Sequence, residues 1–536
     1  GERAYQQREE LRRHLGYEVL RSLARHPWKV SLVDCTGERR EVRAGTLLAA
    51  AATYSRLLRR EVPERRVGIV LPPGAGGYIA NLAVLLAGKI PVNLNFTAGA
   101  TAIEASLRLG GIRTVISAEA MRAKLPQFPW PAQTRDMRAD LAGCGKAAVA
   151  ARLALVWLLP SRLLALLWGV PRVGDHAEAA LLFTSGSSGE PKGVPLTHRN
   201  ILGNCGQISA TGILSKRETL LAFLPIFHSF GFTVTLWYAL MRGVRTVTLP
   251  SPLDAKRIIE VVEAEKVTVF VSTPTFIRPI MKRAEPAQLR SLRFIVSGAE
   301  KLPVDLFEQF LQKFGLRILQ GYGLTETTPV TNVNLPEPRD LPKGVKIQEG
   351  HRLGSVGRLL AGMTARIVHP ETGAELPPDK TGMLCLRGAN VFGGYLKDPV
   401  RTAEALRDGW FVTGDLARFD DDGFLFIEGR LSRFSKVGGE MVPHLTIEQK
   451  IIEAFGLEAA EEPKVVVLGV PDAAKGETLV LLTTETIEAA DLRDKLTVAG
   501  LPNLWIPKTV VRLERIPVLG SGKCDLRGCR ELAGGK

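Results

Sequence analysis

One loop constrains the fold of this 536-residue chain more than any other segment. The run Thr184-Ser-Gly-Ser-Ser-Gly-Glu-Pro-Lys192-Gly193 follows an apolar strand predicted over 179–183. Its glycines let backbone N–H groups approach anionic oxygens, its hydroxyls add donors, and Lys192 adds charge. The loop is not a Walker A motif, because Pro191 precedes the lysine where that motif has glycine. We interpret it as a polyphosphate-binding loop; the alternative, a Ser/Gly linker, is disfavoured by the strand and the lysine.

The order of elements around this loop predicts the fold class. A strand over 67–71, a helix over 78–87 and a strand over 90–93 indicate a parallel α/β sheet, and strands over 267–271 and 293–296 repeat the pattern. From 364 to 427 short strands and glycine turns predict a β-rich subdomain. Mixed elements follow residue 430. With 45% hydrophobic residues, we therefore expect a large α/β domain over 1–430 and a small α+β domain over 431–536.

Charge and cysteine usage narrow the partners and the compartment. The chain has 70 Lys and Arg against 55 Asp and Glu, a net charge of +15, which favours an acidic protein, an anionic lipid or a polyanionic substrate. No nucleic-acid motif accompanies this charge. The six cysteines form neither a C-x-x-C pair nor a Cys/His cluster, and the charged residues 1–25 do not resemble a signal peptide. We expect a cytoplasmic protein without a structural metal; the cysteines are Cys35, Cys144, Cys205, Cys385, Cys524 and Cys529.

The most apolar stretch covers 153–168, LALVWLLPSRLLALLW. Pro160 and Arg162 interrupt it, and it is too short to span a bilayer comfortably. Tryptophans stand near its ends and arginines at 152, 162 and 172 surround it, as in an interfacial anchor. Two interpretations stay open: peripheral contact with the inner face of the cell membrane, or a core helix or subunit contact.

Four later segments, together with the loop, resemble the signatures of one family. These are Gln320-Gly-Tyr-Gly-Leu-Thr-Glu-Thr327, Trp410-Phe-Val-Thr-Gly-Asp415, Gly429-Arg430 and Gly520-Ser-Gly-Lys523. In this order they resemble the signatures of the adenylate-forming superfamily of acyl-CoA synthetases, luciferases and peptide-synthetase adenylation domains. The resemblance extends from about residue 28 to the C-terminus. It implies an enzyme that uses ATP and Mg²⁺ to convert a carboxylic acid into an acyl-adenylate.

The resemblance also assigns roles to individual residues. A carboxylate that attacks the α-phosphate of ATP is repelled by anionic oxygens, so the site must neutralise charge and align the reactants. Tyr322 would stack on adenine, and Asp415 would accept the ribose hydroxyls with Arg430 as an added donor. Thr184 and Glu326 would hold Mg²⁺. The implied ATP-binding residues are Thr184, Ser185, Gly186, Ser187, Ser188, Gly189, Lys192, Gly298, Ala299, Glu300, Gln320, Gly321, Tyr322, Gly323, Thr325, Asp415 and Arg430.

Catalysis is assigned by resemblance to Lys523, Thr325, Glu326 and His228. Lys523 would bridge the attacking carboxylate and the departing phosphate. His228 would form a gate or wall beside the acyl group; a satisfied core histidine is the alternative.

In this superfamily a mobile C-terminal domain rotates between two half-reactions. Its usual hinge residue is Asp or Lys, whereas this chain has Ser432. Gly438 and Gly439 would line the tunnel for the pantetheine thiol, because glycines leave room for a thin chain.

The run over 429–442 and the apolar insert resemble one subfamily in particular, the acyl-ACP synthetase half of bacterial 2-acylglycerophosphoethanolamine acyltransferase/acyl-ACP synthetases. That resemblance implies a long-chain fatty acid as substrate and holo-acyl carrier protein (holo-ACP) as acceptor. An acyl-CoA synthetase that uses free CoA is the nearest alternative. A catalytically silent acyl or nucleotide binder is an alternative from another class.

Overall fold

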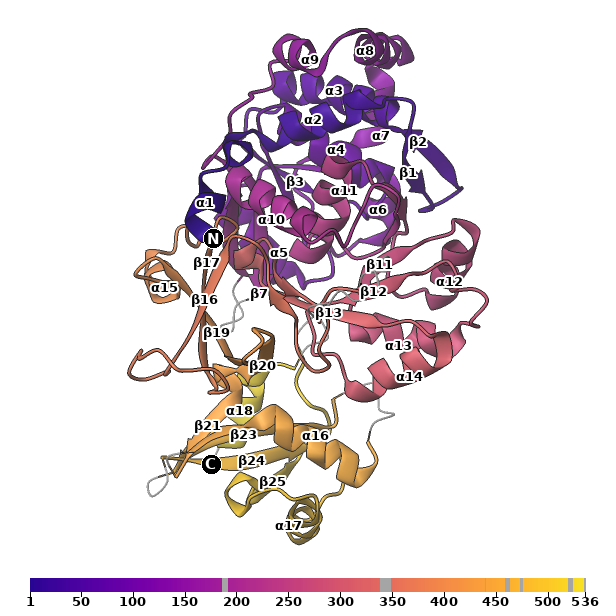
Figure 1. Ribbon diagram of the computed structural model, residues 1–536. Coiled ribbons are helices and arrows are strands. Elements are labelled where there is room, and N and C mark those ends of the chain that lie inside the picture. The colour runs from indigo at the N-terminus through magenta and orange to yellow at the C-terminus, as the bar shows by residue number, and fades with distance from the viewer. Residues whose placement is uncertain are drawn as a thin grey trace, which may run out of the picture.

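The computed structural model describes residues 1–185, 191–337, 349–438, 440–457, 463–472, 476–518 and 524–534. The chain forms a large α/β part, a β-rich subdomain and a small C-terminal part (Figure 1). This confirms the predicted fold class.

A four-stranded parallel sheet has the order β4-β3-β5-β6. Its strands are β3 (Arg66–Ile69), β4 (Ile90–Asn93), β5 (Thr114–Ser117) and β6 (Gln133–Asp136). Strands β4 and β5 are buried along their whole length, as expected where helices cover a parallel sheet. The neighbouring helices are α3 (Ala44–Glu61), α4 (Ala75–Leu86), α5 (Ala100–Gly110) and α6 (Glu119–Lys124).

A nine-stranded sheet has the order β15-β14-β13-β12-β11-β9-β10-β1-β2. Its parallel centre consists of β9 (Thr219–Ala222), β10 (Arg245–Thr248), β11 (Val269–Ser272), β12 (Phe294–Ser297) and the start of β13 (Ile318–Gly323). At the edges lie β1 (Val30–Asp34), β2 (Arg40–Arg43), β14 (Val330–Val333) and β15 (Arg358–Leu359).

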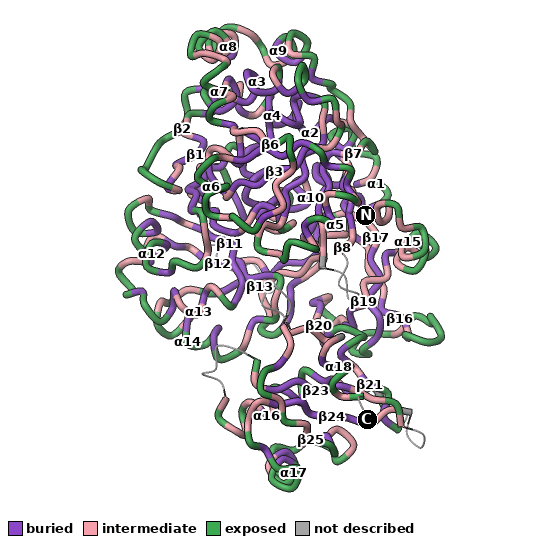
Figure 2. The backbone as a smooth tube through the Cα atoms, turned by 180° about the vertical axis from the view of Figure 1, so that it is seen from behind, coloured by how far each residue is buried: buried purple, intermediate pink, exposed green. Residues whose placement is uncertain are grey.

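Helices on this sheet pack into one core shared with the first sheet (Figure 2). They are α10 (His198–Ala210), α12 (Ala255–Ala264), α13 (Pro274–Arg283) and α14 (Val304–Phe314). Between β9 and β10, a buried π-helix, η2 (Gly231–Tyr238), continues without a break into α11 (Ala239–Arg242). Every residue of η2 is buried.

Two antiparallel units complete the large domain. The predicted polyphosphate loop joins β7 (Glu178–Ser185) and β8 (Pro191–Thr197), which pair as a hairpin. The β-rich subdomain contains β16 (Met363–Val368), β17 (Gly382–Gly388), α15 (Pro399–Ala405), β18 (Leu406–Arg407), β19 (Trp410–Phe419) and β20 (Leu425–Arg430).

The small C-terminal part begins after β20 with the turn η4 (Leu431–Arg433). Its sheet contains β21 (Phe434–Val437), β22 (Glu440–Pro443), β23 (Val465–Asp472), β24 (Gly476–Thr483) and β25 (Thr509–Arg512). Helices α16 (His444–Phe455) and α17 (Ala489–Val498) and helix α18 (Leu526–Gly534) pack against it. Two cores separate from that of the large domain stabilise this sheet. The predicted boundary between residues 430 and 431 lies between β20 and η4.

The N-terminal segment forms α1 (Glu2–Gln6), η1 (Glu9–Arg12) and α2 (Leu15–Arg25). The apolar stretch lies at one end of the molecule beside α2, whereas α1 lies beside the β-rich subdomain (Figure 1). The apolar stretch follows α7 (Met137–Gly143) and divides at Pro160 into α8 (Lys146–Leu158) and α9 (Ser161–Leu167). Val156, Leu164 and Ala165 are buried, whereas Trp157, Leu158, Leu163, Leu166 and Leu167 are exposed. One side of the stretch therefore packs in the core, and the other side is exposed.

Within the described ranges, no single helix is long and apolar enough to cross a bilayer. Only α7 and α8 taken together, bent at 83°, reach those limits of length and composition.

Candidate active site

Adjacent parallel strands end at one edge of the nine-stranded sheet. Ser272, Ser297 and Gln320 are aligned partners on β11, β12 and β13. The loops that follow therefore start side by side, in the position where open α/β sheets bind ligands. Gly298, Ala299 and Glu300 directly follow β12. The segment from Tyr322 to Thr327 covers the last two residues of β13 and the four residues after it.

The segment after β12 contains an unusual backbone conformation. Ala299 has a φ of +67°, a region that L-residues with a side chain rarely adopt. The Glu300 carboxylate accepts a hydrogen bond of 2.6 Å from the hydroxyl of Thr275, at the start of α13. A Cβ atom on Gly298 would lie 3.2 Å from the Phe230 ring, so this turn and the loop after β9 are in close contact.

Asp415 is the best-enclosed carboxylate of the site, with 3% of its surface exposed. The Tyr322 hydroxyl donates a 2.5 Å hydrogen bond to Oδ2, and the Arg430 Nε atom lies 3.2 Å from Oδ1. Asp415 and Arg430 are direct partners across β19 and β20. Burial raises the pKa of Asp415, and Arg430 opposes that shift. The structure thus brings together three residues that were predicted from three separate motifs.

A second cluster joins Glu326, Lys192 and a tyrosine that the motifs did not indicate. The Tyr395 hydroxyl donates a 2.8 Å hydrogen bond to Glu326 Oε1, and Lys192 Nζ lies 5.1 Å from the centre of the Tyr395 ring. Lys192 is the partner of Thr184 across the β7–β8 hairpin. Burial and the nearby Glu326 charge raise the pKa of Tyr395, so its hydroxyl remains a donor at neutral pH.

Two backbone hydrogen bonds fix the loop that carries Tyr395. The Phe392 N–H donates to the Glu326 carbonyl at 2.8 Å, and the Leu396 N–H donates to the Gly193 carbonyl at 2.9 Å. Gly393 and Gly394 precede the tyrosine, and Gly394 has a φ of +135°, which favours glycine. The Gly-Gly-Tyr sequence was the available signal for this residue.

Thr325 and the loop after β9 also meet. The Thr325 hydroxyl donates a 3.3 Å hydrogen bond to the hydroxyl of Ser229, a second residue that the motifs did not indicate. The neighbouring His228 is exposed, so the alternative of a satisfied core histidine is wrong. Just beyond it, a Cβ atom on Gly231 would lie 2.4 Å from the Pro225 carbonyl oxygen, and only glycine allows this tight turn into η2.

Glu326 suits a magnesium ion that also binds phosphate. Oε1 accepts from Tyr395, while Oε2 has no hydrogen-bond donor among the described residues. The described parts of the chain contain no group of three or more His, Cys, Asp or Glu side chains that could enclose a metal. Mg²⁺ usually binds through one or two carboxylates together with substrate phosphates and water. Glu326, close to the β7–β8 hairpin that carries the predicted polyphosphate loop, fits that pattern.

Several predicted residues lie outside the described residues: Gly186, Ser187, Ser188, Gly189, Gly439 and Lys523. Of Ser185, the structure describes the backbone at the end of β7. The structure does describe the predicted hinge Ser432, whose carbonyl accepts a 3.1 Å hydrogen bond from Arg530.

Gly438 has a φ of +59° and lies near Leu504 in the C-terminal part. Close to it, Lys436 forms an ion pair with Glu371, on the connection between β16 and β17. No described contact joins Gly438 to the cluster around Glu326.

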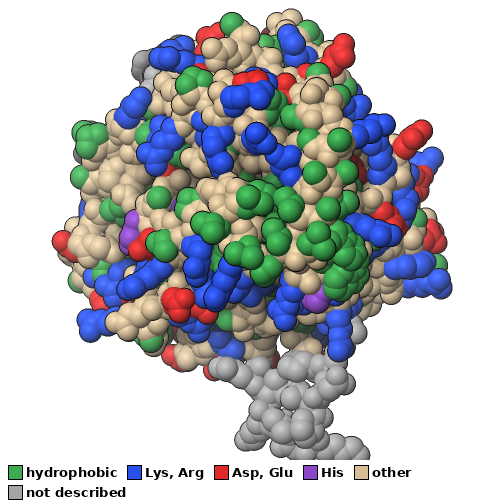
Figure 3. Space-filling view, turned by 90° about the horizontal axis from the view of Figure 1, so that it is seen from above, with side chains coloured by type: hydrophobic (Ala, Val, Ile, Leu, Met, Phe, Trp, Pro, Cys, Tyr) green, Lys and Arg blue, Asp and Glu red, His purple; other side chains and the backbone are tan. Residues whose placement is uncertain are grey.

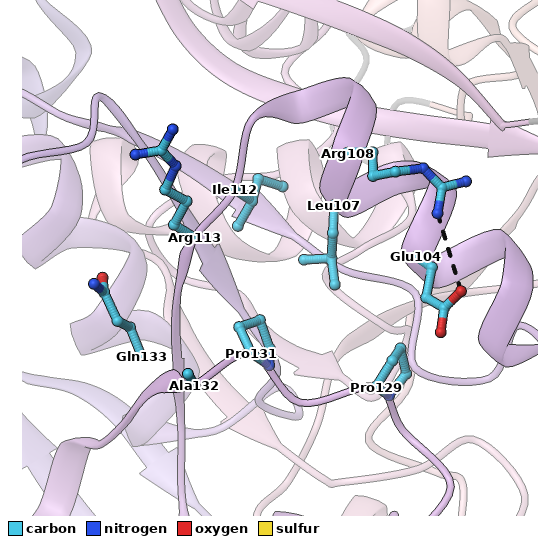
Figure 4. Close-up of a pocket in the computed structure, with 9 residues that line it drawn as sticks. All are labelled: Glu104, Leu107, Arg108, Ile112, Arg113, Pro129, Pro131, Ala132 and Gln133. Atoms are coloured by element: carbon cyan, nitrogen blue, oxygen red, sulfur yellow. Dashed lines mark ion pairs between the residues drawn. The ribbon is translucent and has the colours of Figure 1, made fainter.

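A separate hollow of about 460 Å³ lies beside α5. Figure 4 shows its wall, with Glu104 and Arg108 forming an ion pair of 4.0 Å on the helix and Pro129 and Pro131 opposite. None of the predicted site residues lines it.

Comparison with known proteins identifies relatives over about two thirds of the chain. The model of a family described as AMP-binding enzyme matches residues 19–396. A feruloyl-CoA synthase of an Amycolatopsis species is 33% identical over 361 residues, covering 66% of this chain and 69% of that protein. A long-chain-fatty-acid–CoA ligase of Bacillus subtilis is 31% identical over 362 residues, covering 66% and 62%.

Solved structures share the fold over nearly the full length. ATP-bound MatB from Rhodopseudomonas palustris is 25% identical with a TM-score of 0.75, and the match covers 96% of this chain and 99% of that one. The O-succinylbenzoate CoA synthetase MenE from Bacillus subtilis, in complex with ATP and magnesium ion, has a TM-score of 0.77 at 22% identity, with 96% and 99% covered.

Proposed function

Because this chain belongs to the AMP-binding enzyme family and is an ATP-dependent, AMP-forming acid–thiol ligase, we propose that it activates a long-chain fatty acid and transfers the acyl group to holo-ACP. The observation that carries the chemistry is the pair of clusters around Asp415 and Glu326, in which Tyr322 and Tyr395 each donate a hydrogen bond to one carboxylate. Family membership favours this activity over a catalytically silent binder.

A long apolar acid is supported by the apolar segment that follows His228. The π-helix η2 starts three residues after this histidine and buries Phe232, Leu236 and Trp237. Apolar side chains next to the site favour an alkyl chain over a charged or polar acid. Proteins named long-chain-fatty-acid–CoA ligase are among the relatives, from Bacillus and from Salmonella.

Two half-reactions follow from this assignment. In the first, a carboxylate oxygen attacks the α-phosphorus of ATP, the bond to the departing pyrophosphate breaks, and Lys192 and Lys523 offset the crowded negative charge. In the second, the thiol sulfur attacks the acyl carbonyl carbon, AMP leaves, and the thiol proton passes to solvent. Rotation of residues 431–536 about Ser432 would exchange Lys523 for Gly438 and Gly439 beside the acyl group.

We assign Mg²⁺ to Glu326, with the Thr184 hydroxyl nearby on the hairpin, where the ion would neutralise phosphate charge. Tyr395 is a positioning residue for this carboxylate. Tyr395→Phe should weaken the apparent affinity for Mg²⁺ about fivefold, because one net hydrogen bond contributes about 1 kcal/mol. The KM for the fatty acid should stay constant. A magnesium titration of ATP/pyrophosphate exchange measures this effect.

The Phe substitution keeps the ring beside Lys192, whereas Tyr395→Ala also removes the ring and should lower kcat. Tyr17→Phe on α2, a buried tyrosine outside the predicted site, serves as the matched control. A Tyr395→Phe enzyme with a normal magnesium titration would contradict the role of the hydroxyl.

Holo-ACP as acceptor is supported by the run over 429–442 and by the net charge of +15, because acyl carrier proteins are acidic. Free CoA is the second candidate, and two observations favour it. The relatives named above are CoA ligases or synthases by name. Residues 431–536, which carry the predicted thiol tunnel, have 14 Lys and Arg against 15 Asp and Glu and are not basic.

Product analysis with radiolabelled palmitate, ATP and either acceptor tests this choice. We expect a higher kcat/KM for holo-ACP, and a steeper fall with salt for holo-ACP than for CoA, because docking of an acidic protein uses many screened charges. Measurements at low and physiological salt separate the two. Equal or better use of CoA at both salt concentrations would assign the enzyme as an acyl-CoA synthetase.

A further inference from the structure

The end of the molecule that carries α8 and α9 exposes an unusual number of large apolar side chains. One side of these helices packs on α3 and α2 through Val156, Leu164 and Ala165. On the other side, Leu158 and Leu166 are 77% and 78% exposed. The apolar face consists of Trp28, Trp157, Leu158, Leu163, Leu166 and Leu167, and the Trp28 and Trp157 rings lie 5.9 Å apart.

Figure 3 views this end and shows hydrophobic side chains gathered in one area with Lys and Arg around it. The sequence explains this border. Between Asp140 and Asp175 there is no acidic residue, while Lys146, Arg152, Arg162 and Arg172 all fall there. Large exposed apolar patches mark interaction sites, and leucine and tryptophan bordered by cations suit the interface of an anionic bilayer.

The excess positive charge of the chain is concentrated in the same part of the sequence. Residues 1–174 contain 26 Lys and Arg against 13 Asp and Glu, whereas residues 175–536 are near balance with 44 against 42. The net charge is therefore a property of the part that includes α2, α3, α8 and α9. An anionic surface would attract this end of the molecule first.

A basic cavity of about 970 Å³ opens beside the apolar face. The break between α8 and α9 at Pro160 and Ser161 forms part of its wall, together with α2 and the end of α11. Five cations in the wall have no acidic partner within 4 Å in the described parts of the chain: Arg8, Arg25, Lys29, Lys216 and Arg242.

The cavity also contains polar groups without hydrogen-bond partners. The Ser31 hydroxyl, on a residue that is 93% buried, has none among the described residues, and neither has Arg242 Nε. Of the two carboxylates in the wall, Glu18 is neutralised by Arg13 at 3.2 Å and Arg21 at 2.8 Å, and Glu10 is exposed. A cavity with unpaired cations and a buried free hydroxyl has the chemistry of a phosphate site.

We propose that this end of the protein docks on an anionic membrane, with the apolar face of α8 and α9 in the lipid interface and a phospholipid headgroup phosphate in the basic cavity. The cavity and the apolar face share the α8–α9 break, so one lipid can place its phosphate in the first and its chains beside the second. This proposal does not depend on which thiol acceptor the enzyme uses.

Vesicle sedimentation tests the proposal, with phosphatidylcholine vesicles alone and with added phosphatidylglycerol. The full chain should bind the anionic vesicles at least tenfold more strongly. Leu163→Ser/Leu166→Ser/Leu167→Ser should lower binding to both kinds of vesicle at least tenfold. Arg25→Gln/Lys29→Gln/Lys216→Gln should remove mainly the preference for anionic lipid.

Matched controls remove equal apolarity or charge elsewhere on the surface. Leu253, Val400 and Val498 are exposed, and their triple change to Ser should leave vesicle binding unchanged. The exposed cations Lys256, Lys282 and Arg283 on α12 and α13 serve the same purpose when changed to Gln. Thermal unfolding of each variant shows whether it is folded.

Three results would overturn the proposal. In the first, the folded leucine and basic variants sediment with anionic vesicles as the unchanged protein does. In the second, the leucine variant shifts a dimer to a monomer without any loss of vesicle binding, which makes the face a contact between two copies of the chain. In the third, the basic variant binds inorganic phosphate or holo-ACP more weakly but binds vesicles as the unchanged protein does. The cavity would then be a site for a free anion or an acidic protein.

Discussion

Replacing Asp415 with alanine should raise the KM for ATP about 10- to 150-fold in ATP/pyrophosphate exchange. This range corresponds to about 1.5–3 kcal/mol, the typical loss when a charged hydrogen-bond partner is removed. Asp415 is buried and contacts both Tyr322 and Arg430. Among the described residues, no other carboxylate contacts these two donors. Removal of this acceptor would leave the ribose hydroxyls without a partner.

A substrate analogue distinguishes lost recognition from lost folding. The unchanged enzyme should use 2′-deoxy-ATP less well than ATP, and the Asp415→Ala enzyme should no longer discriminate between them. Tyr322→Phe removes the hydroxyl that contacts Oδ2 but keeps the ring, so it should preserve the discrimination. An Asp415→Ala enzyme with a normal ATP dependence would show that the ribose site lies elsewhere.

The pH dependence gives the same carboxyl an independent signature. Burial raises the pKa of Asp415, so this group takes up a proton at a higher pH than an exposed aspartate. Protonation removes an acceptor from the ribose site, and the KM for ATP should therefore rise as the pH falls. In Asp415→Asn this acid-side rise should disappear.

Replacing Lys523 with alanine should reduce acyl-adenylate formation about a hundredfold or more while ATP binding persists. A preorganised charge that contacts the developing transition state contributes on this scale, whereas the resting nucleotide is held by the other motifs. ATP/pyrophosphate exchange measures the first step, and equilibrium binding of ATP measures the second.

Two comparisons make this result specific to Lys523. Lys508→Ala removes an exposed lysine from the same C-terminal part and should retain full exchange activity. Thioester formation from a supplied acyl-adenylate should survive in Lys523→Ala, because the second half-reaction uses the other orientation of this part. Near-normal exchange in Lys523→Ala would exclude this lysine from the mechanism.

The elements were predictable where the local pattern agrees with the tertiary structure. The strand expected over 90–93 is β4, and short β-branched runs between turns also located β11 and β12 within two residues. The apolar stretch was harder, because hydrophobicity alone does not show which side of a helix has a partner. Leu164 packs inside while Leu163 and Leu166 lie outside, and only the position of α2 and α3 decides this.

The site was predictable as far as its residues lie in compact motifs. Lys192, Glu326 and Asp415 each belong to such a motif, although these motifs lie on the β7–β8 hairpin, after β13 and on β19, in three different sheets. Tyr395 and Ser229 could not be assigned in this way. Tyr395 reaches Glu326 across 69 positions of sequence and Ser229 reaches Thr325 across 96, so each contact depends on how separate loops are placed.

The unbroken helical segment formed by η2 and α11 has a thermodynamic consequence. It begins at Gly231, beside the proposed acyl site, and ends at Arg242 in the wall of the basic cavity. A close-packed segment of this kind can transmit strain from one end to the other, and π-helical turns occur often at functional sites. If a bound anionic lipid changes the affinity of the enzyme for the fatty acid by some factor, bound fatty acid must change the affinity for the lipid by the same factor. The amount of enzyme held at a membrane would then report how much fatty acid that membrane supplies.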